Sequence, residues 1–553
     1  MVYLLSALSF AILVVATPVH SAGAPTAAIR NGTYQGVRSY EYDQDFFLGM
    51  AYAQPPLRNL RFRQARSLNT TWTGTREATS YSPLCVGYGL DQTFYTQSED
   101  CLTINVIRPV GYENQTLPVG VWIHGGGYVN GGGGDQRYNQ SFIVDQSVKI
   151  GRPFIGVSFN YRLHGWGFLG SRELASEGLT NIGYHDQRLA LHWVQENIGA
   201  FNGDASKVTI WGESAGAASV GLHLTAYGGR DDGLFRAAIM QSGNPIFYSA
   251  QKNSSQYQNV FDQLVGRSGC NNTLDKVDCL RQLPFERLNA TMGALYLEYG
   301  GLNPSIDNDI IRGYGSVQLS RGEFVKVPII TGANSDEGAS FSAQGINDTS
   351  AFRATLSSIS VPNQDKILAL YPDSLAQNVV ASLGDQRPAL PYGSQFRRSA
   401  TYQGDYVFIA ARRQTAATWA AHGLSAYAYR FNAIPHGVPP EIGAGHFKEI
   451  GYVFRNFLGV GNRPDIKPFE GMPEGHFELS RLMSSSWASF IHDLDPNGWN
   501  GRPRDVEAWP KYDGGNPLDF VFDANVTSHA EGDSWRKEGI DWINQNAARV
   551  YSR

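Results

Sequence analysis

The sequence is poor in charge and in cysteine. Only 17% of its 553 residues are charged, the formal net charge is −5, and 4 residues are cysteine. A chain that is 42% hydrophobic and 12% aromatic has ample material for a packed core, which excludes disordered, collagen-like and coiled-coil proteins. Because no run of basic residues is present, we expect no nucleic-acid partner. Four cysteines in so long a chain do not make a small disulfide scaffold.

Long apolar runs are absent apart from one near the N-terminus. The run from Leu4 to Ala16 has no charged residue and is shorter than the roughly 20 apolar residues that span a membrane. We expect residues 1–22 to be a signal peptide, cleaved between residues 16 and 24, although no Lys or Arg precedes the run. The alternative is an N-terminal strand or helix of the core. Residues 23–553 are then expected to be secreted, without a transmembrane segment.

Two further features agree with an extracellular location. The cysteines form two local pairs, Cys85 with Cys101 and Cys270 with Cys279, and each pair would close a short disulfide loop in an oxidising compartment. The alternative is four buried free thiols. Asn-x-Ser/Thr sequons, which are candidates for glycosylation in a eukaryotic host, begin at Asn31, Asn69, Asn114, Asn139, Asn253, Asn271, Asn289, Asn347 and Asn525.

Two kinds of ligand-binding motif are missing. No Cys-x-x-Cys or clustered Cys/His spacing indicates a zinc site. The glycine run at 131–134 is not followed by the Gly-Lys-Ser/Thr of a phosphate-binding loop. We therefore expect neither a metal nor an organic cofactor.

Short β-rich runs alternate with helical patterns through most of the chain. From Leu189 to Ile198 the apolar residues have helical spacing, with Asp186 near the helix start. This alternation predicts an α/β fold with a large, mostly parallel central sheet flanked by helices. Because no linker or composition shift is found, residues 23–553 are expected to form a single domain. The predicted strands are 119–123, 154–159, 208–211, 237–240, 327–331 and 424–431.

The strongest chemical motif is Gly-Glu-Ser-Ala-Gly at 212–216, directly after the predicted strand 208–211. A serine on a sharp strand-to-helix turn has a strained backbone, and glycines two residues before and after it let the turn close. Such a turn lifts the Ser214 hydroxyl clear of the sheet. The motif therefore predicts a nucleophilic serine.

A second glycine-rich motif, His-Gly-Gly-Gly-Tyr at 124–128, follows the predicted strand 119–123. Glycines expose backbone N–H groups, which acyl-transfer enzymes use where negative charge develops on a carbonyl oxygen. We expect the N–H groups of Gly126, Gly127 and Ala215 to form this oxyanion hole.

With these motifs the chain resembles the type-B carboxylesterase/lipase family, an α/β-hydrolase family that also contains the cholinesterases. It looks especially similar to secreted fungal lipases and esterases. The matching segments keep the family's order along the chain and are Ser98–Asn105, His124–Tyr128, Asn160–Arg162, Trp166–Phe168, Gly212–Gly216, Gln241–Gly243, Asn334–Gly338 and His446–Phe454. The resemblance implies the α/β-hydrolase fold.

The resemblance also implies a triad of Ser214, Glu337 and His446. Glu337 lies after the predicted strand 327–331 and immediately before a glycine, where the family carries its acid; Asp336 is the alternative. Six histidines follow Glu337, and only His446 has the family's Glu-Ile-x-Tyr-Val-Phe continuation. His436 is the alternative histidine.

The implied chemistry is hydrolysis of carboxylic esters through an acyl-enzyme. His446 would take the proton of Ser214, and Glu337 would hold the imidazole and stabilise its charged form. We also expect Glu99 to pair with Arg162.

We also expect Ser242 to support the triad without itself contacting the substrate.

The loop between Cys85 and Cys101 bears on the substrate. In this family the loop is a lid in interfacial lipases and carries an aromatic choline platform in cholinesterases. Here it is short and contains Tyr88, Phe94 and Tyr95 but no Trp, so we expect an esterase with an open pocket for a small-molecule ester or lipid.

The alternatives are a lipase for triacylglycerols or sterol esters and, from another class, an inactive binding protein of the same fold. Such binding proteins typically lose the serine or the histidine. The sequence leaves the natural ester and the oligomeric state open.

Overall fold

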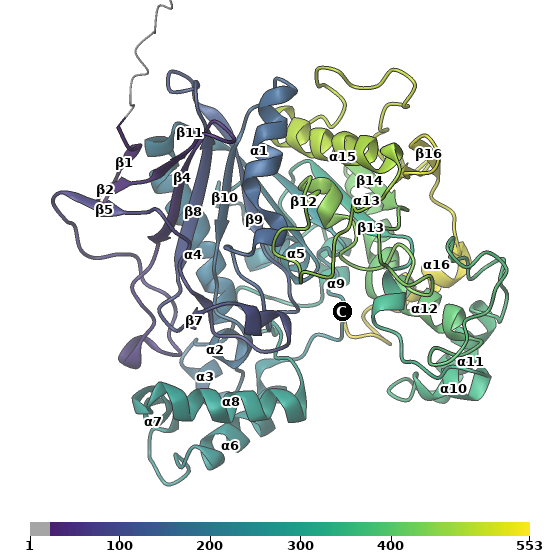
Figure 1. The fold of residues 1–553 in the computed structure, drawn as a ribbon. Helices are drawn as coiled ribbons and strands as arrows, with labels where there is room; N and C mark the ends of the chain where they lie inside the picture. The colour runs from purple at the N-terminus through teal and green to yellow at the C-terminus, as the bar shows by residue number, and fades with distance from the viewer. Residues whose placement is uncertain (1–22) are drawn as a thin grey trace, which may run out of the picture.

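The computed structural model describes residues 23–553, and the predicted signal peptide lies outside the described residues. An eleven-stranded sheet forms the centre of the molecule (Figure 1). Its strands are, in spatial order, β16 (His529–Gly532), β15 (Leu518–Phe522), β14 (Ala426–Phe431), β13 (Ile329–Asn334), β12 (Ala237–Gln241), β11 (Gly203–Glu213), β9 (Leu117–Ile123), β10 (Ile155–Phe159), β8 (Thr103–Pro109), β4 (Gln44–Ala51) and β3 (Val37–Ser39).

The middle of this sheet is parallel. Every pairing from β10 through β9, β11, β12, β13 and β14 to β15 is parallel, whereas β16, β8, β4 and β3 add antiparallel strands at the two edges. The predicted large and mostly parallel sheet is therefore confirmed. All six predicted strands are present in it.

Sequence reasoning missed the strands near the edges. Three of these strands carry a charged residue next to one end: Asp45 in β4, Arg108 in β8 and Asp519 in β15. These charges are paired inside the protein, since Arg108 lies 3.0 Å from Asp45 and Asp519 lies 3.3 Å from Arg412. The partners are far apart in the chain, so a local pattern does not reveal them.

Helices cover both faces of the sheet. One face packs against α4 (Ile182–Asn197), α5 (Ala215–Thr225) and α13 (Ala410–Ala421), and the other against α1 (Gln140–Lys149) and α15 (Glu474–Asp493). Side chains alternate along each strand, so neighbouring residues enter different cores.

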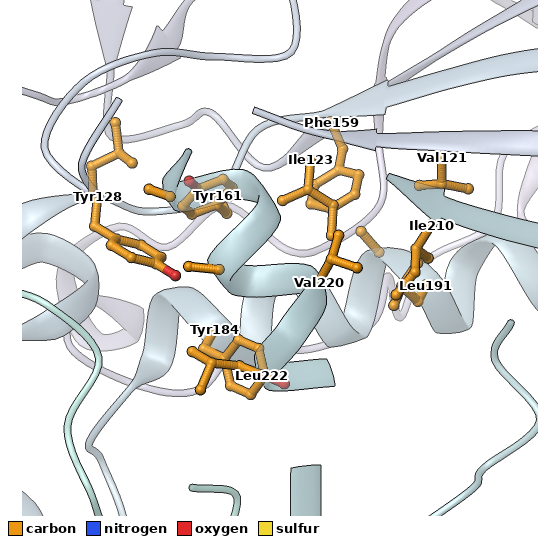
Figure 2. Close-up of a cluster of buried hydrophobic side chains, with 14 of the residues drawn as sticks. Val121, Ile123, Tyr128, Phe159, Tyr161, Tyr184, Leu191, Ile210, Val220 and Leu222 are labelled. Atoms are coloured by element: carbon orange, nitrogen blue, oxygen red, sulfur yellow. The ribbon is translucent and has the colours of Figure 1, made fainter. Parts of the chain in front are cut away.

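On the first face, Val121, Ile123 and Ile210 meet Leu191 of α4 and Val220 of α5 (Figure 2). On the second face, Trp122 and Trp211 pack edge to face with ring centroids 4.7 Å apart.

The remaining elements lie around this body. The helices are α2 (His164–Phe168), α3 (Arg172–Ser176), α6 (Gln258–Arg267), α7 (Lys276–Gln282), α8 (Phe285–Tyr299), α9 (Gly315–Ser320), α10 (Thr349–Ala354), α11 (Val361–Leu370), α12 (Phe396–Gly404), α14 (Ile450–Val453) and α16 (Lys537–Gln545). The further strands are β1 (Thr26–Ile29), β2 (Gly32–Gln35) and β5 (Thr75–Glu77) in one small sheet and β6 (Leu84–Cys85) and β7 (Gln97–Ser98) in another. Within residues 23–553, no helix has the length and apolar character needed to cross a bilayer.

One sequence-based expectation about charged residues was wrong. Asp186 lies near the start of its helix, as the fifth residue of α4, and its carboxylate accepts two hydrogen bonds from the Arg162 guanidinium at 2.6 and 2.7 Å. Glu99 therefore does not pair with Arg162; it binds the Arg61 guanidinium at 2.6 and 2.7 Å. The reason is tertiary: α4 carries Asp186 to the end of β10, where Arg162 lies.

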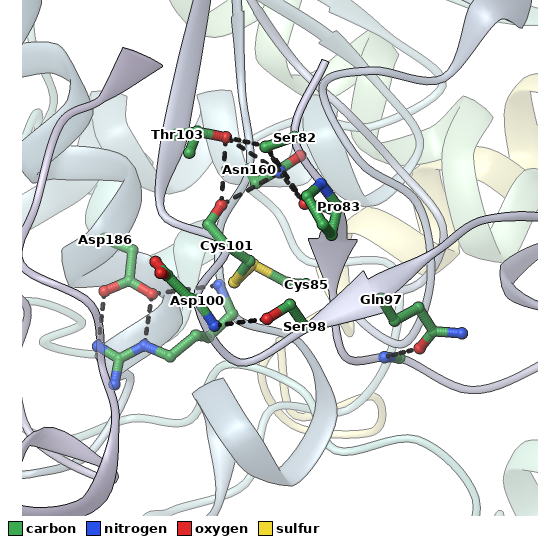
Figure 3. The surroundings of a disulfide bond; sticks show 12 residues. Ser82, Pro83, Cys85, Gln97, Ser98, Asp100, Cys101, Thr103, Asn160 and Asp186 are labelled. Atoms are coloured by element: carbon green, nitrogen blue, oxygen red, sulfur yellow. Dashed lines mark hydrogen bonds and ion pairs between the residues drawn. A yellow bond between two sulfur atoms is a disulfide. The ribbon is translucent and has the colours of Figure 1, made fainter. Parts of the chain in front are cut away.

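Both predicted disulfides are formed. Cys85 is bonded to Cys101, and Cys270 to Cys279. At the base of the first loop, the Asn160 carboxamide donates to the carbonyl oxygens of Pro83 and Cys101, each at 3.1 Å (Figure 3). The loop is thus anchored to the end of β10.

The first turn of α5 packs against β9 without spare room. A Cβ atom on Gly216 would lie 2.0 Å from the carbonyl oxygen of Ile123. Gly216→Ala must therefore displace α5 or β9, and we predict that it lowers the free energy of unfolding by about 1–3 kcal/mol. Chemical denaturation followed by tryptophan fluorescence measures this.

The matched control is Gly199→Ala, because a Cβ atom there has no neighbour within 4 Å. Its free energy of unfolding is expected to stay within about 0.5 kcal/mol of wild type. Equal effects of the two substitutions would contradict the packing argument.

Candidate active site

Ser214 lies at the turn between β11 and α5, at the carboxyl end of a central strand. Its backbone has φ 57° and ψ −125°, a conformation that is strained for a residue with a side chain. The Ser214 N–H donates to the Gln241 carbonyl oxygen of β12 at 2.9 Å, which holds the turn on the sheet. The predicted sharp strand-to-helix turn is present.

Glu337 and His446, which are far apart in the sequence, are in contact. Glu337 begins a short 3₁₀ turn after β13, and its Oε2 lies 2.7 Å from His446 Nδ1. Its Oε1 accepts from the Asn334 N–H at 2.8 Å and from the Ser242 hydroxyl at 2.5 Å. Glu337 is fully buried, so these bonds fix its carboxylate and, through it, the imidazole. Ser242 supports the acid, as expected.

Two phenylalanines hold the other sides of the imidazole. Phe408 is stacked on His446 with ring centroids 4.7 Å apart, and Phe341 meets it edge to face at 5.0 Å. Phe408 belongs to a π-helical turn, Asp405–Ile409, between α12 and α13. A π-helical insertion in a helix often marks a functional site, because it redirects side chains.

The second ring nitrogen of His446 faces Glu213. Nε2 lies 3.1 Å from Glu213 Oε1, although the two groups are not aligned as a hydrogen bond, and Oε1 has no hydrogen-bond partner among the described residues. Among the same residues, no hydrogen bond joins Ser214 Oγ to His446. Ser214 and His446 nevertheless line one cavity.

Buried carboxylates govern the titration of His446. Burial alone would lower the pKa of His446, but the negative charges of Glu213 and Glu337 outweigh it and raise that pKa to about 9. Burial in turn raises the pKa of Glu213 well above its ordinary value and also raises the pKa of Glu449. The hydrogen bond between His446 Nδ1 and Glu337 Oε2 raises the pKa of His446 further.

A cavity of about 610 Å³ opens over these groups. Its wall is mainly apolar and aromatic, whereas polar groups lie at Ser214, His446 and a few other positions. The lining residues besides those two include Asp91, Gly126, Gly127, Val129, Asn130, Arg137, Glu213, Tyr248, Phe341, Tyr406, Val407, Phe408 and Phe447. A cavity of this size and character suits a small organic ligand.

Two of the three predicted oxyanion donors line this cavity together with Ser214. Gly126 and Gly127 line it and have φ of +94° and +63°, a region that favours glycine. Ala215 is the first residue of α5, where a helix leaves its N–H groups without a partner in the helix. Within residues 23–553, no hydrogen bond is found from the N–H of Gly126 or Gly127.

The alternative residues lie elsewhere. Asp336 turns away from His446, and its Oδ2 accepts from the Ala444 N–H at 2.8 Å; burial raises its pKa to about 6. His436 makes a backbone bond to Pro468 and is not among the residues that line the cavity.

Sequence reasoning missed the two further carboxylates near His446. Glu213 sits inside the serine motif, and Glu449 follows the histidine; the Glu449 side chain accepts from Asn334 Nδ2 at 2.7 Å and Gln241 Nε2 at 3.2 Å. The available signal was their position, because Glu213 adjoins Ser214 and Glu449 lies three residues after His446. The described residues contain no cluster of three or more metal-ligating side chains.

The sequon asparagines differ in exposure. Asn139 and Asn289 are partly buried: Asn139 caps α1 through its side chain, and the Asn289 side chain accepts from the Tyr88 hydroxyl at 2.8 Å. Asn31 is also partly buried. The exposed members are Asn69, Asn114, Asn253, Asn271, Asn347 and Asn525.

Comparison with curated proteins finds fungal lipases. The chain is 32% identical to Lipase 4 of Diutina rugosa, covering 98% of this chain and 99% of that protein. It is 31% identical to Secreted lipase 1 of Botryotinia fuckeliana, covering 97% and 94%. It is 30% identical to Secreted triacylglycerol lipase LIP1 of Gibberella zeae, covering 95% and 91%.

The fold has a close counterpart among solved structures. The crystal structure of Aspergillus niger EstA matches with a TM-score of 0.82 and 27% identity, covering 96% of this chain and 99% of that one. The model of the Carboxylesterase family matches residues 23–533. The chain therefore has the α/β-hydrolase fold, belongs to the carboxylesterase family and is a carboxylic ester hydrolase.

Proposed function

We propose that this protein is a secreted serine carboxylesterase that uses Ser214, His446 and Glu337 as its catalytic triad. The observation that carries the proposal is the 2.7 Å contact between Glu337 Oε2 and His446 Nδ1 in a cavity that Ser214 also lines. The acid fixes one ring nitrogen, which leaves Nε2 free to act as a base toward the serine.

In the first half of the reaction, His446 Nε2 takes the proton of Ser214 while Ser214 Oγ attacks the ester carbonyl. This step requires Nε2 to turn from Glu213 toward Ser214, and catalytic hydrogen bonds often tighten only when substrate is present. His446 then donates the proton to the leaving alcohol, and an acyl-enzyme remains. Water repeats the sequence and releases the carboxylic acid.

Negative charge on the carbonyl oxygen would be stabilised by the N–H groups of Gly126, Gly127 and Ala215. Each such donor typically contributes about 3 kcal/mol to the transition state. Their support is geometric, since the two glycines border the cavity next to Ser214. No cofactor or metal takes part in this chemistry.

We further propose that residues 23–553 form one catalytic domain that is exported after loss of a leader at 1–22. The two disulfides and the names of the relatives, two of which are called secreted, support export. Of the nine sequon asparagines, we propose the exposed ones as the glycosylated sites, because a glycan needs room around the side-chain nitrogen.

The cavity supports an esterase for small or medium-sized esters with apolar groups. Lipase activity on triacylglycerols is the second candidate. The relatives' names favour it, and so do Leu90 and Phe94, which are 65% and 61% exposed on the loop that also supplies Asp91 to the cavity.

The first prediction from the proposed function concerns the nucleophile. Ser214→Ala is expected to lower kcat on a p-nitrophenyl ester by at least about 10⁴-fold, because the covalent step is lost. A fluorophosphonate probe should label wild type but not the variant, and the variant should unfold at the wild-type temperature. An inactive, unlabelled wild type would instead favour a binding protein.

The second prediction concerns pH. His446 acts as a base only when it is neutral, so kcat/KM is expected to fall as the pH drops through its raised pKa. Glu213→Gln removes a negative charge beside the imidazole, which lowers the pKa of His446 and moves this acid limb down by roughly one pH unit.

Glu298→Gln on the exposed end of α8 is the control for the pH profile, and its acid limb should coincide with that of wild type. If Glu213→Gln leaves the limb in place, Glu213 does not set the titration of His446.

The third prediction separates esterase from lipase. With a chain-length series of esters, we expect the rate to saturate smoothly as concentration passes the solubility limit. Hydrolysis is followed by titration of the released acid, with Ser214→Ala as the blank. A sharp rise in rate at the solubility limit would favour the lipase candidate.

A further inference from the structure

The loop closed by Cys85 and Cys101 contains one buried polar side chain that no step of the reaction uses. Its short turn Asp91–Phe94 faces solvent at Asp91, Thr93 and Phe94, but Gln92 is only 1% exposed. Burying a carboxamide is unfavourable unless its hydrogen bonds are made.

Both ends of the Gln92 carboxamide are satisfied, and they join two different segments. Nε2 donates to the Cys85 carbonyl oxygen at 2.8 Å, which lies in the loop's own disulfide base. Oε1 accepts from the Gly131 N–H at 2.7 Å. Gly131 belongs to the segment 124–131 that carries Gly126 and Gly127.

The same two segments touch at neighbouring points. The Tyr88 N–H donates to the Val129 carbonyl oxygen at 2.7 Å, and a Cβ atom on Gly87 would lie 2.6 Å from that oxygen. At the cavity rim, Asp91 is paired with Arg137 at 2.8 Å. The loop is therefore joined to the glycine-rich segment at Tyr88 and Gln92, and to Arg137 at Asp91.

Gly131 in turn packs against the residues that precede the predicted oxyanion donors Gly126 and Gly127. A Cβ atom on Gly131 would lie 2.6 Å from His124 Nδ1 and 2.9 Å from the Gly125 carbonyl oxygen, so its backbone rests directly on the start of the segment. The Gly126 carbonyl oxygen accepts from the N–H groups of Val129 and Asn130 at 3.0 and 3.1 Å. Residues 125–131 thus form a closed turn that Gln92 holds at one end.

We propose that Gln92 is a positioning residue: its carboxamide fastens the Cys85–Cys101 loop to Gly131 and so keeps the N–H groups of Gly126 and Gly127 in place for the oxyanion. The effect on catalysis rests on the proposed function. The loop is then a fixed support of the oxyanion segment, and it does not open as a lid during turnover. Preorganised donors lower a barrier only if they do not have to move as charge develops.

The test compares three variants of the loop. Gln92→Met keeps the length of the side chain but loses both hydrogen bonds. Gln92→Glu keeps the acceptor for the Gly131 N–H, and because burial favours its protonated form, its carboxyl O–H replaces the amide as the donor to Cys85. Thr93→Val is the matched control, since it removes a bond inside the same turn, from the Thr93 hydroxyl to the Leu90 carbonyl oxygen, and leaves the link to Gly131 intact.

The first readout is amide hydrogen exchange of peptides that cover residues 124–134, which does not depend on any activity. Gln92→Met is expected to speed exchange there at least tenfold, Gln92→Glu to stay closer to wild type than to Gln92→Met, and Thr93→Val to match wild type. Unchanged exchange in Gln92→Met overturns the proposal, as does equal loss of protection in Thr93→Val.

The second readout is ester hydrolysis. Gln92→Met should lower kcat about tenfold with KM within twofold of wild type, and Gln92→Glu should recover most of kcat. A structural defect alone would lower the fraction of enzyme that a fluorophosphonate labels, so kcat is expressed per labelled site. Faster exchange with unchanged kcat per site overturns the positioning role. Faster exchange in a chain whose wild type hydrolyses no ester leaves the link in place and refutes the proposed function.

Discussion

The strained turn at Ser214 is the constraint on which the site depends. A positive φ at a residue with a side chain costs of order 1–3 kcal/mol and persists only where the surroundings impose it. Here β11 lies between the parallel strands β9 and β12. Because Gly216 has no Cβ atom, α5 packs directly against the end of β9. Because these elements are buried on both faces, the turn cannot relax without breaking the core.

The Ser214 turn is also connected by hydrogen bonds to the buried carboxyl groups of Glu449 and Glu337. Gln241 accepts from the Ser214 N–H through its backbone, donates to Glu449 through its side chain, and accepts from Trp487 Nε1 at 3.0 Å. Glu449 in turn binds Asn334, whose N–H holds Glu337. One connected set of hydrogen bonds therefore runs from the serine turn to the carboxylate that orients His446.

Although the chain has few charged residues, several of them form ion pairs in the interior of the protein. Arg162 with Asp186, Arg61 with Glu99, and Arg412 with its aspartates join segments that are distant in sequence. Buried pairs of this kind contribute little net stability, but the loss of one partner is costly, so they fix which segments lie together. In the active site the charges are not matched one to one, because Glu213, Glu337 and Glu449 all lie near the imidazole of His446. This excess of negative charge favours the protonated form of the imidazole.

Local patterns determined much of this protein. Apolar runs marked the central strands, and the glycines around Ser214 marked the sharp turn. These features are readable because they depend on neighbouring residues, namely on turn chemistry and side-chain alternation. Glu337 and His446 were assigned through the resemblance to the carboxylesterase/lipase family. Only the tertiary structure decided that Arg162 pairs with Asp186, that Glu213 faces His446, and that Gln92 reaches Gly131. Those contacts join side chains from segments far apart, and their geometry exists only once the sheet has brought the ends of its strands together.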